Sequence, residues 1–122
     1  MKIAWIVGAS VAAVGCSTTE PPLEPNCGDV GVPAITVTPL DYRTDQPIQG
    51  QAVVIARDGG YADTAHAEPG MRTVGVAYNR AGSYSVAVTA PGYALWQREP
   101  VVVLQGRCNV STTPLAARLV LP

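Results

Sequence analysis

The chain of 122 residues is long enough for one domain and too short for two. Its formal net charge of −1, from eight Lys plus Arg against nine Asp plus Glu, lacks the basic excess of a nucleic-acid-binding protein, so we expect no nucleic-acid partner. Twelve Gly and eleven Pro, with no Phe, favour strands and tight turns over helices.

A short apolar segment, Ile3 to Val14, follows Lys2 at the amino terminus. It has twelve residues, whereas a membrane-spanning helix needs about 20. A charged start, an apolar middle and the small residue Gly15 match a signal peptide instead. We therefore expect residues 1–15 to be a signal peptide.

The four residues from Ala13 to Cys16 resemble a bacterial lipobox, where a cysteine thiol is acylated and the chain is cut just before it. Ala13 departs from the pattern, which most often has Leu there. The resemblance implies that Cys16 begins the mature protein and anchors it to a membrane. Each buried methylene of an acyl chain contributes about 0.8 kcal/mol, so two or three chains hold a domain stably. The alternative is an ordinary cleaved signal peptide, with Cys16 a stray thiol.

Residues 16–31 are expected to hold the lipidated cysteine and a tether. Ser17 to Asn26 contains three Pro and two Glu without periodicity, and ten such residues reach roughly 30 Å if extended. A leader with no spacing role is the alternative. Lipoproteins similar to this one, with Ser17 rather than Asp after the cysteine, are often passed outward. We expect a location in the cell envelope facing the periplasm or the cell surface, with the outer membrane favoured.

If Cys16 is acylated, Cys27 and Cys108 remain. An even number of cysteines outside the cytoplasm predicts one disulfide. Closing a loop of about 80 residues stabilises the fold by roughly 4–5 kcal/mol when the lost entropy of the unfolded chain is counted. Two free thiols or a thiolate metal pair are the alternatives. With one His and no CxxC spacing, we do not expect a zinc site.

From Val32 onward, apolar side chains recur with a period of two or form short apolar runs, which indicates strands. The expected strands are Ile35 to Pro39, Gln51 to Arg57, Val74 to Tyr78, Ser83 to Thr89, Val101 to Leu104 and Leu115 to Leu121. Turn signals separate them, among them a hairpin turn at Asp58-Gly59-Gly60. This spacing predicts one all-β domain over residues 32–122, a sandwich or barrel.

Two segments fit this pattern less well. Tyr61 to Glu68 is rich in Ala, and we expect a short helix or an ordered loop there. The segment after Thr113 has a possible helix cap followed by Pro114 in the first turn. We favour a strand, because the leucines that follow keep a period of two.

The segment Gly82 to Tyr93 reads Gly-Ser-Tyr-Ser-Val-Ala-Val-Thr-Ala-Pro-Gly-Tyr. It resembles a carboxypeptidase regulatory-like domain, a transthyretin-like (prealbumin-like) fold in which a Gly-x-Tyr-x-Val-x-Val strand is followed shortly by Gly-Tyr. Ile35 to Val54, where a polar turn and Pro-Ile lead into a second strand, is also typical of that family. The resemblance covers roughly Ala34 to Leu121. It implies a single seven-strand-type antiparallel β-sandwich with no catalytic residues of its own.

The residues of this motif have structural explanations. Gly82 is expected to permit the backbone angle that closes the preceding turn. Tyr84 is expected to bury its ring while its hydroxyl finds a partner near the rim. Gly92 is expected to allow a tight bend, after which Tyr93 folds over the sandwich edge.

His66 is the only histidine of the chain. With Asp63 and Glu68, and with Asp58 nearby, it is a candidate for a weak metal site, but solvated loop polarity is the favoured interpretation. Neither a GxSxG nucleophile pattern nor a phosphate-binding Gly loop occurs. We therefore expect no metal, no cofactor and no enzymatic activity.

The expected function is a structural or protein-interaction role for a lipid-anchored envelope domain. Its partners would be the membrane, through the lipid, and an unknown envelope protein or glycan. The alternative is a carbohydrate-binding accessory module, similar to starch-binding sandwiches, with Trp96, Tyr61 and Tyr93 as an exposed aromatic platform. We favour packing of Trp96 and Tyr93 in or beside the core, because a domain without Phe needs large side chains there.

Overall fold

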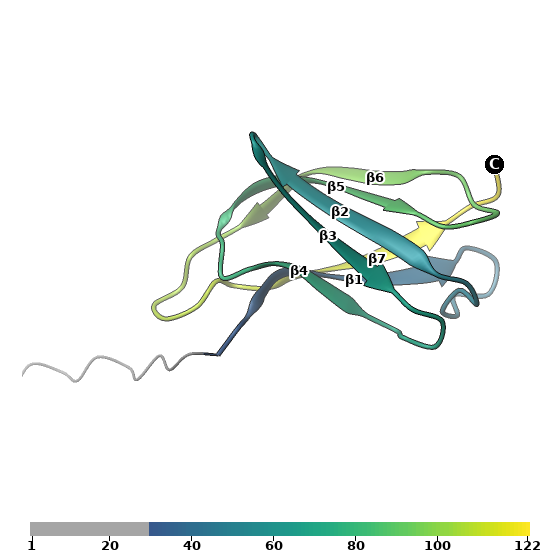
Figure 1. Cartoon of the computed structure of the whole chain (residues 1–122), viewed down its shortest axis with the longest axis horizontal. Coiled ribbons are helices and arrows are strands. Elements are labelled where there is room, and N and C mark those ends of the chain that lie inside the picture. Colours follow the sequence, from purple (N-terminus) through teal and green to yellow (C-terminus); the bar gives the residue numbers. More distant parts are fainter. Residues whose placement is uncertain (1–29) are drawn as a thin grey trace, which may run out of the picture.

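The computed structural model describes residues 30–122, and these residues form an all-β sandwich (Figure 1). The expected signal peptide, Cys16, the tether up to residue 29 and Cys27 lie outside the described residues. The strands are β1 (Pro33–Asp41), β2 (Ala52–Asp58), β3 (Tyr61–Ala67), β4 (Val74–Tyr78), β5 (Gly82–Thr89), β6 (Trp96–Val103) and β7 (Thr113–Leu119). A three-stranded sheet in the order β4-β1-β7 packs against a four-stranded sheet in the order β3-β2-β5-β6.

One strand pair departs from the antiparallel sandwich that we expected. β1 and β7 run parallel, from the pair Ile35 and Thr113 to the pair Asp41 and Leu119. Parallel neighbours need a crossover connection. Here the chain passes through the whole four-stranded sheet, ending in β6, before β7 returns to β1.

The expectation of a helix or loop over Tyr61–Glu68 is wrong, because Tyr61–Ala67 is the edge strand β3. Gly59, with a φ of 60°, closes the hairpin turn, and β3 then pairs with β2 along its length. Three residues of β3 are alanines, and their small side chains do not produce the alternation of large apolar and polar residues that predicts a strand. β6 also begins earlier than expected, at Trp96, whereas the strand expected from the leucines near the C-terminus is present as β7.

The core lies between the two sheets and consists mainly of Val and Ala. On β5 the side chains of Tyr84, Val86 and Val88 alternate inward with at most 1 % of their surface exposed. On β1, Ile35 and Val37 are fully buried and face them from the other sheet. Tyr84 is the largest fully buried side chain among the described residues, so it fills the space that a Phe would otherwise take.

Both open sides of the sandwich are closed by side-chain contacts. On one side, the backbone N–H of Ala77 on β4 donates to Oδ2 of Asp63 on β3, at 2.8 Å. Ala77 has a φ of 58°, a conformation that L residues rarely adopt, and the bond to Asp63 helps to hold it there. On the other side, the Thr113 hydroxyl of β7 donates to the Val102 carbonyl of β6, at 3.4 Å. Each contact satisfies one backbone group of an edge strand, on β4 at one side and on β6 at the other.

The crossing from β4 to β5 is held by Tyr84. Its hydroxyl donates to the Arg80 carbonyl oxygen, four residues upstream, at 2.5 Å, in the arrangement known as a tyrosine corner. Nη1 of Arg80 in turn donates to the Tyr84 hydroxyl oxygen at 3.2 Å and to Asp58 Oδ2 at 3.0 Å. The Arg80 guanidinium also lies 4.0 Å from the centre of the Tyr61 ring. The buried ring and its rim partner agree with what the motif predicts for Tyr84.

The two glycines of the motif act differently from each other. Gly92 has a φ of 85°, which fits the tight bend expected after Pro91. Gly82 has no positive φ, so the expectation that its backbone angle closes the turn is wrong. A Cβ at Gly82 would lie 2.5 Å from Asp58 Oδ2, and the glycine therefore leaves room for the ion pair of Asp58 with Arg80.

We expect Tyr84→Phe to lower the free energy of unfolding by about 1–3 kcal/mol, because the Arg80 carbonyl loses its buried donor. Urea denaturation measures this difference. Tyr78→Phe is the matched control, since Tyr78 is 52 % exposed and its hydroxyl makes no hydrogen bond to another described residue. Equal losses in the two variants would show that the Tyr84 hydroxyl does not hold the crossing.

Candidate functional site

The sandwich has two ends, and the described chain begins at one of them (Figure 1). Val30 lies at the end that holds the β2–β3 hairpin, the β4–β5 connection and the β6–β7 loop. The opposite end, called the distal end below, holds the β1–β2, β3–β4 and β5–β6 loops and residues 120–122. Loops on a rigid scaffold are common places for binding residues. The distal end also contains the most strongly bonded side chain of the fold.

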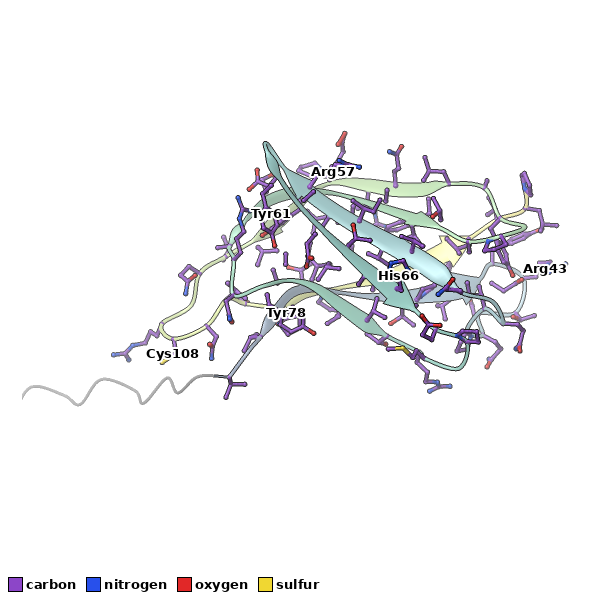
Figure 2. All side chains as sticks on the ribbon, in the orientation of Figure 1. Arg43, Arg57, Tyr61, His66, Tyr78 and Cys108 are labelled. Carbon is purple, nitrogen blue, oxygen red and sulfur yellow. The ribbon has the colours of Figure 1, made fainter. Side chains whose placement is uncertain are left out.

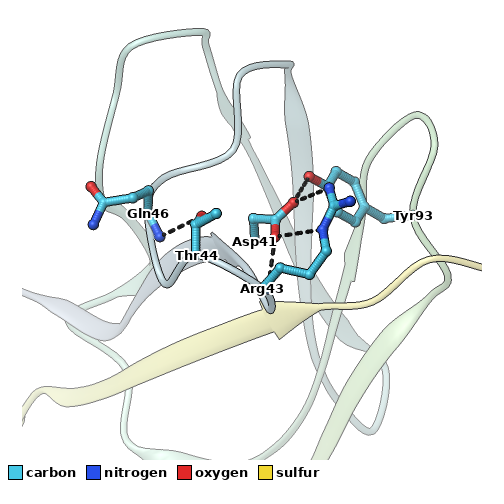
Figure 3. A network of polar contacts seen from close by, with 5 residues as sticks. All are labelled: Asp41, Arg43, Thr44, Gln46 and Tyr93. Carbon is cyan, nitrogen blue, oxygen red and sulfur yellow. Dashed lines mark hydrogen bonds and ion pairs between the residues drawn. The ribbon is translucent and has the colours of Figure 1, made fainter.

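Asp41, at the end of β1, is the one buried charged or polar residue among those the structure describes, with 8 % of its surface exposed. Figure 3 shows that its carboxylate accepts four hydrogen bonds. Oδ1 accepts from the Arg43 backbone N–H at 2.8 Å and from Arg43 Nε at 3.2 Å. Oδ2 accepts from Arg43 Nη2 at 3.0 Å and from the Tyr93 hydroxyl at 2.7 Å. We call this group of three residues the Asp41 clamp.

The Asp41 clamp joins two loops, since Arg43 lies in the β1–β2 loop and Tyr93 in the β5–β6 loop. The C-terminal segment is joined to the same loops through its backbone. The Tyr42 N–H donates to the Leu119 carbonyl at 3.1 Å, and the Ala94 N–H donates to the Val120 carbonyl at 2.7 Å. The distal end is therefore held in one arrangement by short hydrogen bonds.

The electrostatics of the clamp favour a charged, fully bonded carboxylate. The hydrogen bond from the Arg43 side chain, followed by those from Tyr93 and the Arg43 N–H, holds the pKa of Asp41 well below its usual range. The hydrogen bond to Asp41, with burial adding to it, raises the pKa of Tyr93. A carboxylate has about four lone-pair sites, and four donors occupy them here. Asp41 thus has no site left for proton transfer, and the clamp is structural.

Exposed apolar side chains lie on the segments that the clamp and these backbone hydrogen bonds join. Tyr42 is 43 % exposed, Leu95 55 %, Val120 45 % and Leu121 47 %, and these four residues are called the distal patch below. The Arg43 guanidinium lies 5.7 Å from the centre of the Tyr42 ring. An open hollow of about 340 Å³, lined in part by Asp41 and Tyr93, adjoins the β1–β2 loop.

The three aromatic residues of the alternative carbohydrate-binding interpretation do not lie together in the structure. Tyr61 on β3 pairs in register with Asp58 at one end of β2. Trp96 on β6 pairs with Val88 on β5, which in turn pairs with Val54 on β2. Four residues of strand between Val54 and Asp58 correspond to about 13 Å. Tyr61 and Trp96 are each half-buried and pack against the core. The three side chains of the alternative interpretation therefore do not form one platform. Trp96 and Tyr93 pack against the core, as the favoured interpretation predicts, and the Tyr93 hydroxyl donates to Asp41.

The acidic residues near His66 do not converge on it. His66 is exposed on the outer face of β3, whereas Asp63 lies on the opposite face and bonds Ala77. Glu68 accepts a hydrogen bond from Gln51 at 2.8 Å, and Asp58 is paired with Arg80. Within residues 30–122, no group of three or more His, Cys, Asp and Glu side chains is placed to hold a metal ion.

Cys108 lies half-buried in the β6–β7 loop, at the end of the sandwich where the described chain begins (Figure 2). Its expected partner, Cys27, precedes Val30 by three positions and lies outside the described residues. The disulfide therefore stays a prediction, as do acylation of Cys16 and the signal peptide. The described part of the chain contains no helix that is long and apolar enough to cross a membrane.

Sequence reasoning missed the Asp41 clamp. Asp41 belongs to the polar turn expected between Ile35 and Val54, and no bond was predicted for it. Arg43 nevertheless follows it at the spacing at which an Asp side chain bonds the backbone two residues on. This local spacing could have predicted the bond from the Arg43 backbone to Asp41. The bond to Tyr93, 52 residues away, had no signal in the sequence.

Comparison of the chain with protein-family models and with curated proteins found no match. The sandwich agrees in fold class with the carboxypeptidase regulatory-like resemblance, which itself stays a prediction.

We expect Asp41→Asn to lower the melting temperature at neutral pH, because Arg43 and Tyr93 lose their charged acceptor. A carboxyl group with a depressed folded-state pKa contributes stability that is present above its unfolded pKa of about 3.9 and lost as the pH falls further. The difference in melting temperature between wild type and variant should therefore become smaller below about pH 4. Thermal unfolding from pH 7 to pH 2 would check this.

Asp45→Asn is the control for this experiment, since the Asp45 side chain is 57 % exposed in its ion pair with Arg118. Its effect on melting temperature should be small. A gap between wild type and Asp41→Asn that stays constant across the pH range would contradict the role assigned to the charge.

Proposed function

We propose that the protein is a non-enzymatic, lipid-anchored module of the cell envelope that binds another envelope protein through its distal end. The observation that supports this most directly is that Val30 and the distal patch lie at opposite ends of the sandwich (Figure 1). An anchor upstream of Val30 holds the domain by one end. The distal end then faces away from the lipid, where a partner can reach it.

The anchor is the acylated Cys16, which becomes the first residue of the mature chain when residues 1–15 are cleaved off. The short apolar segment, the small residue Gly15 and the lipobox-like sequence support it. The Pro-rich segment Ser17 to Asn26 would lift the domain by up to roughly 30 Å. Ser17 supports transfer to the outer membrane.

A disulfide between Cys27 and Cys108 belongs to the same proposal. Three residues of extended chain span up to about 10 Å, and Cys108 lies at the end of the fold where Val30 begins. The bridge would fasten the start of the domain to the β6–β7 loop. The pull of the tether would then act on the stapled fold rather than on β1 alone.

The distal patch has the composition of a protein-binding surface. It combines Tyr42 and a neighbouring Arg43 with three aliphatic side chains, and Tyr and Arg are enriched among residues that dominate binding energy. The Asp41 clamp holds these segments before a partner arrives. A surface that is already ordered loses less conformational entropy on binding.

The anchor is tested by metabolic labelling of cells with a clickable palmitate analogue. Wild-type protein should be labelled and should fractionate with membranes, whereas Cys16→Ser should lose the label and be released from them. Cys108→Ser, which retains Cys16, is the control and should keep the label. An unlabelled wild-type protein in the soluble fraction would refute the anchor.

The distal patch is tested by crosslinking in intact cells with Leu95→Asp and Val102→Asp. Each of the two side chains is 55 % exposed in the wild type, but Val102 lies on β6, outside the distal patch. A crosslinked partner band should fall about tenfold or more in Leu95→Asp, as expected when a charge enters an apolar interface. It should persist in Val102→Asp. Equal bands in both variants would place the partner elsewhere.

A further inference from the structure

A second hollow lies on the four-stranded sheet, away from the distal end and beside a β-bulge. Tyr84 pairs with Val101 and Val86 pairs with Arg98, so Ser85 alone faces two residues of β6. Those two residues are Glu99 and Pro100. The hollow that these residues border measures about 400 Å³. Bulges are frequent beside functional sites because they redirect side chains.

Three strands contribute polar groups to this hollow. Arg57 comes from the end of β2 and is paired in register with Ser85 on β5 (Figure 2). Ser83 and Ser85 lie between the charged walls, and Glu99 comes from β6. The hollow therefore has a cation on one side, an anion on the other and hydroxyls between them.

None of these four polar side chains is used by the fold. Within the described residues, Arg57 and Glu99 form no ion pair, and the hydroxyls of Ser83 and Ser85 form no hydrogen bond. The neighbouring Asp58 is different, since Arg80 engages its carboxylate at 3.0 Å. β5 lies between β2 and β6, so their backbones are about 10 Å apart.

The chemistry of the hollow selects a ligand that is neutral and polar along its length. The positive charge of one guanidinium and the negative charge of one free carboxylate cancel, so a net charge on the ligand gains no electrostatic stabilisation. The hydroxyls between them disfavour an apolar centre. A guanidinium donates, a carboxylate accepts and a hydroxyl does both, which matches the hydroxyl groups of a sugar.

We propose that this hollow binds a neutral saccharide of one or two rings. The Arg57 guanidinium donates to hydroxyl oxygens of the sugar, Glu99 accepts from its hydroxyl groups, and Ser83 and Ser85 contact the middle. The volume falls in the lower part of the range of small-molecule sites, about 300–1,000 Å³. The site uses neither the Asp41 clamp nor the distal patch, so it does not depend on the protein partner proposed above.

The test is an NMR titration of the isotope-labelled full-length protein, with maltose, cellobiose and chitobiose as probes. At least one disaccharide should shift the backbone signals of Arg57, Ser83 and Ser85 in a saturable way. Glu99→Gln should weaken that binding about tenfold or more, because the charged acceptor is lost. Arg98→Gln is the control, since Arg98 is exposed on the same strand but does not line the hollow. It should bind as the wild type does.

Glu99 is exposed and unpaired within the described residues, so Glu99→Gln should keep the folded spectrum. Three outcomes overturn the proposal: no saturable shift with any of the sugars, shifts confined to other residues, or unchanged binding in Glu99→Gln. Binding of the zwitterion Gly-Gly in place of the sugars also overturns it. None of these results bears on the Leu95→Asp crosslinking.

Discussion

The hydrogen bond from the buried Tyr84 hydroxyl to the Arg80 carbonyl is the interaction on which the sandwich most depends. It holds the chain where it passes from the three-stranded sheet to the four-stranded one. The same ring is the largest fully buried side chain of a core that consists mainly of Val and Ala. Arg80, aligned by the bond, reaches Asp58 and Tyr61, and so joins the β2–β3 hairpin to the crossing. One side chain thereby couples packing between the sheets to the geometry of the end where the described chain begins.

The two ends of the molecule differ in a way that suits an anchored binding module. At the end near Val30, the bonds around Tyr84 hold the β4–β5 connection, and the loop of Cys108 lies at the same end. At the distal end, the Asp41 clamp orders loops that expose apolar side chains. A buried carboxylate that accepts four hydrogen bonds has no lone pair free to react, but it holds the neighbouring loops in a fixed arrangement. The hollow beside the bulge is the opposite case, because its polar groups are left without partners in the fold.

Much of the architecture could be predicted because it depends on local patterns. The alternation in β1, β4 and β5 and the turn signals between them predicted an all-β domain, and the structure has one. β3 was missed because its alanines show no contrast between a buried and an exposed face. Gly82 was assigned to a turn angle, whereas its actual neighbour is Asp58, 24 residues earlier in the chain.

The amino-acid sequence by itself determined that the domain is all-β, that Tyr84 is buried and that the chain bends at Gly92, since each depends on residues a few positions apart. Only the tertiary structure decided that β7 lies parallel to β1, that Tyr93 meets Asp41, and that Arg57 and Glu99 border one hollow. The physical reason is strand register. A shift of one residue turns every side chain of a strand to the other face, and register between distant strands is settled by packing of the whole core.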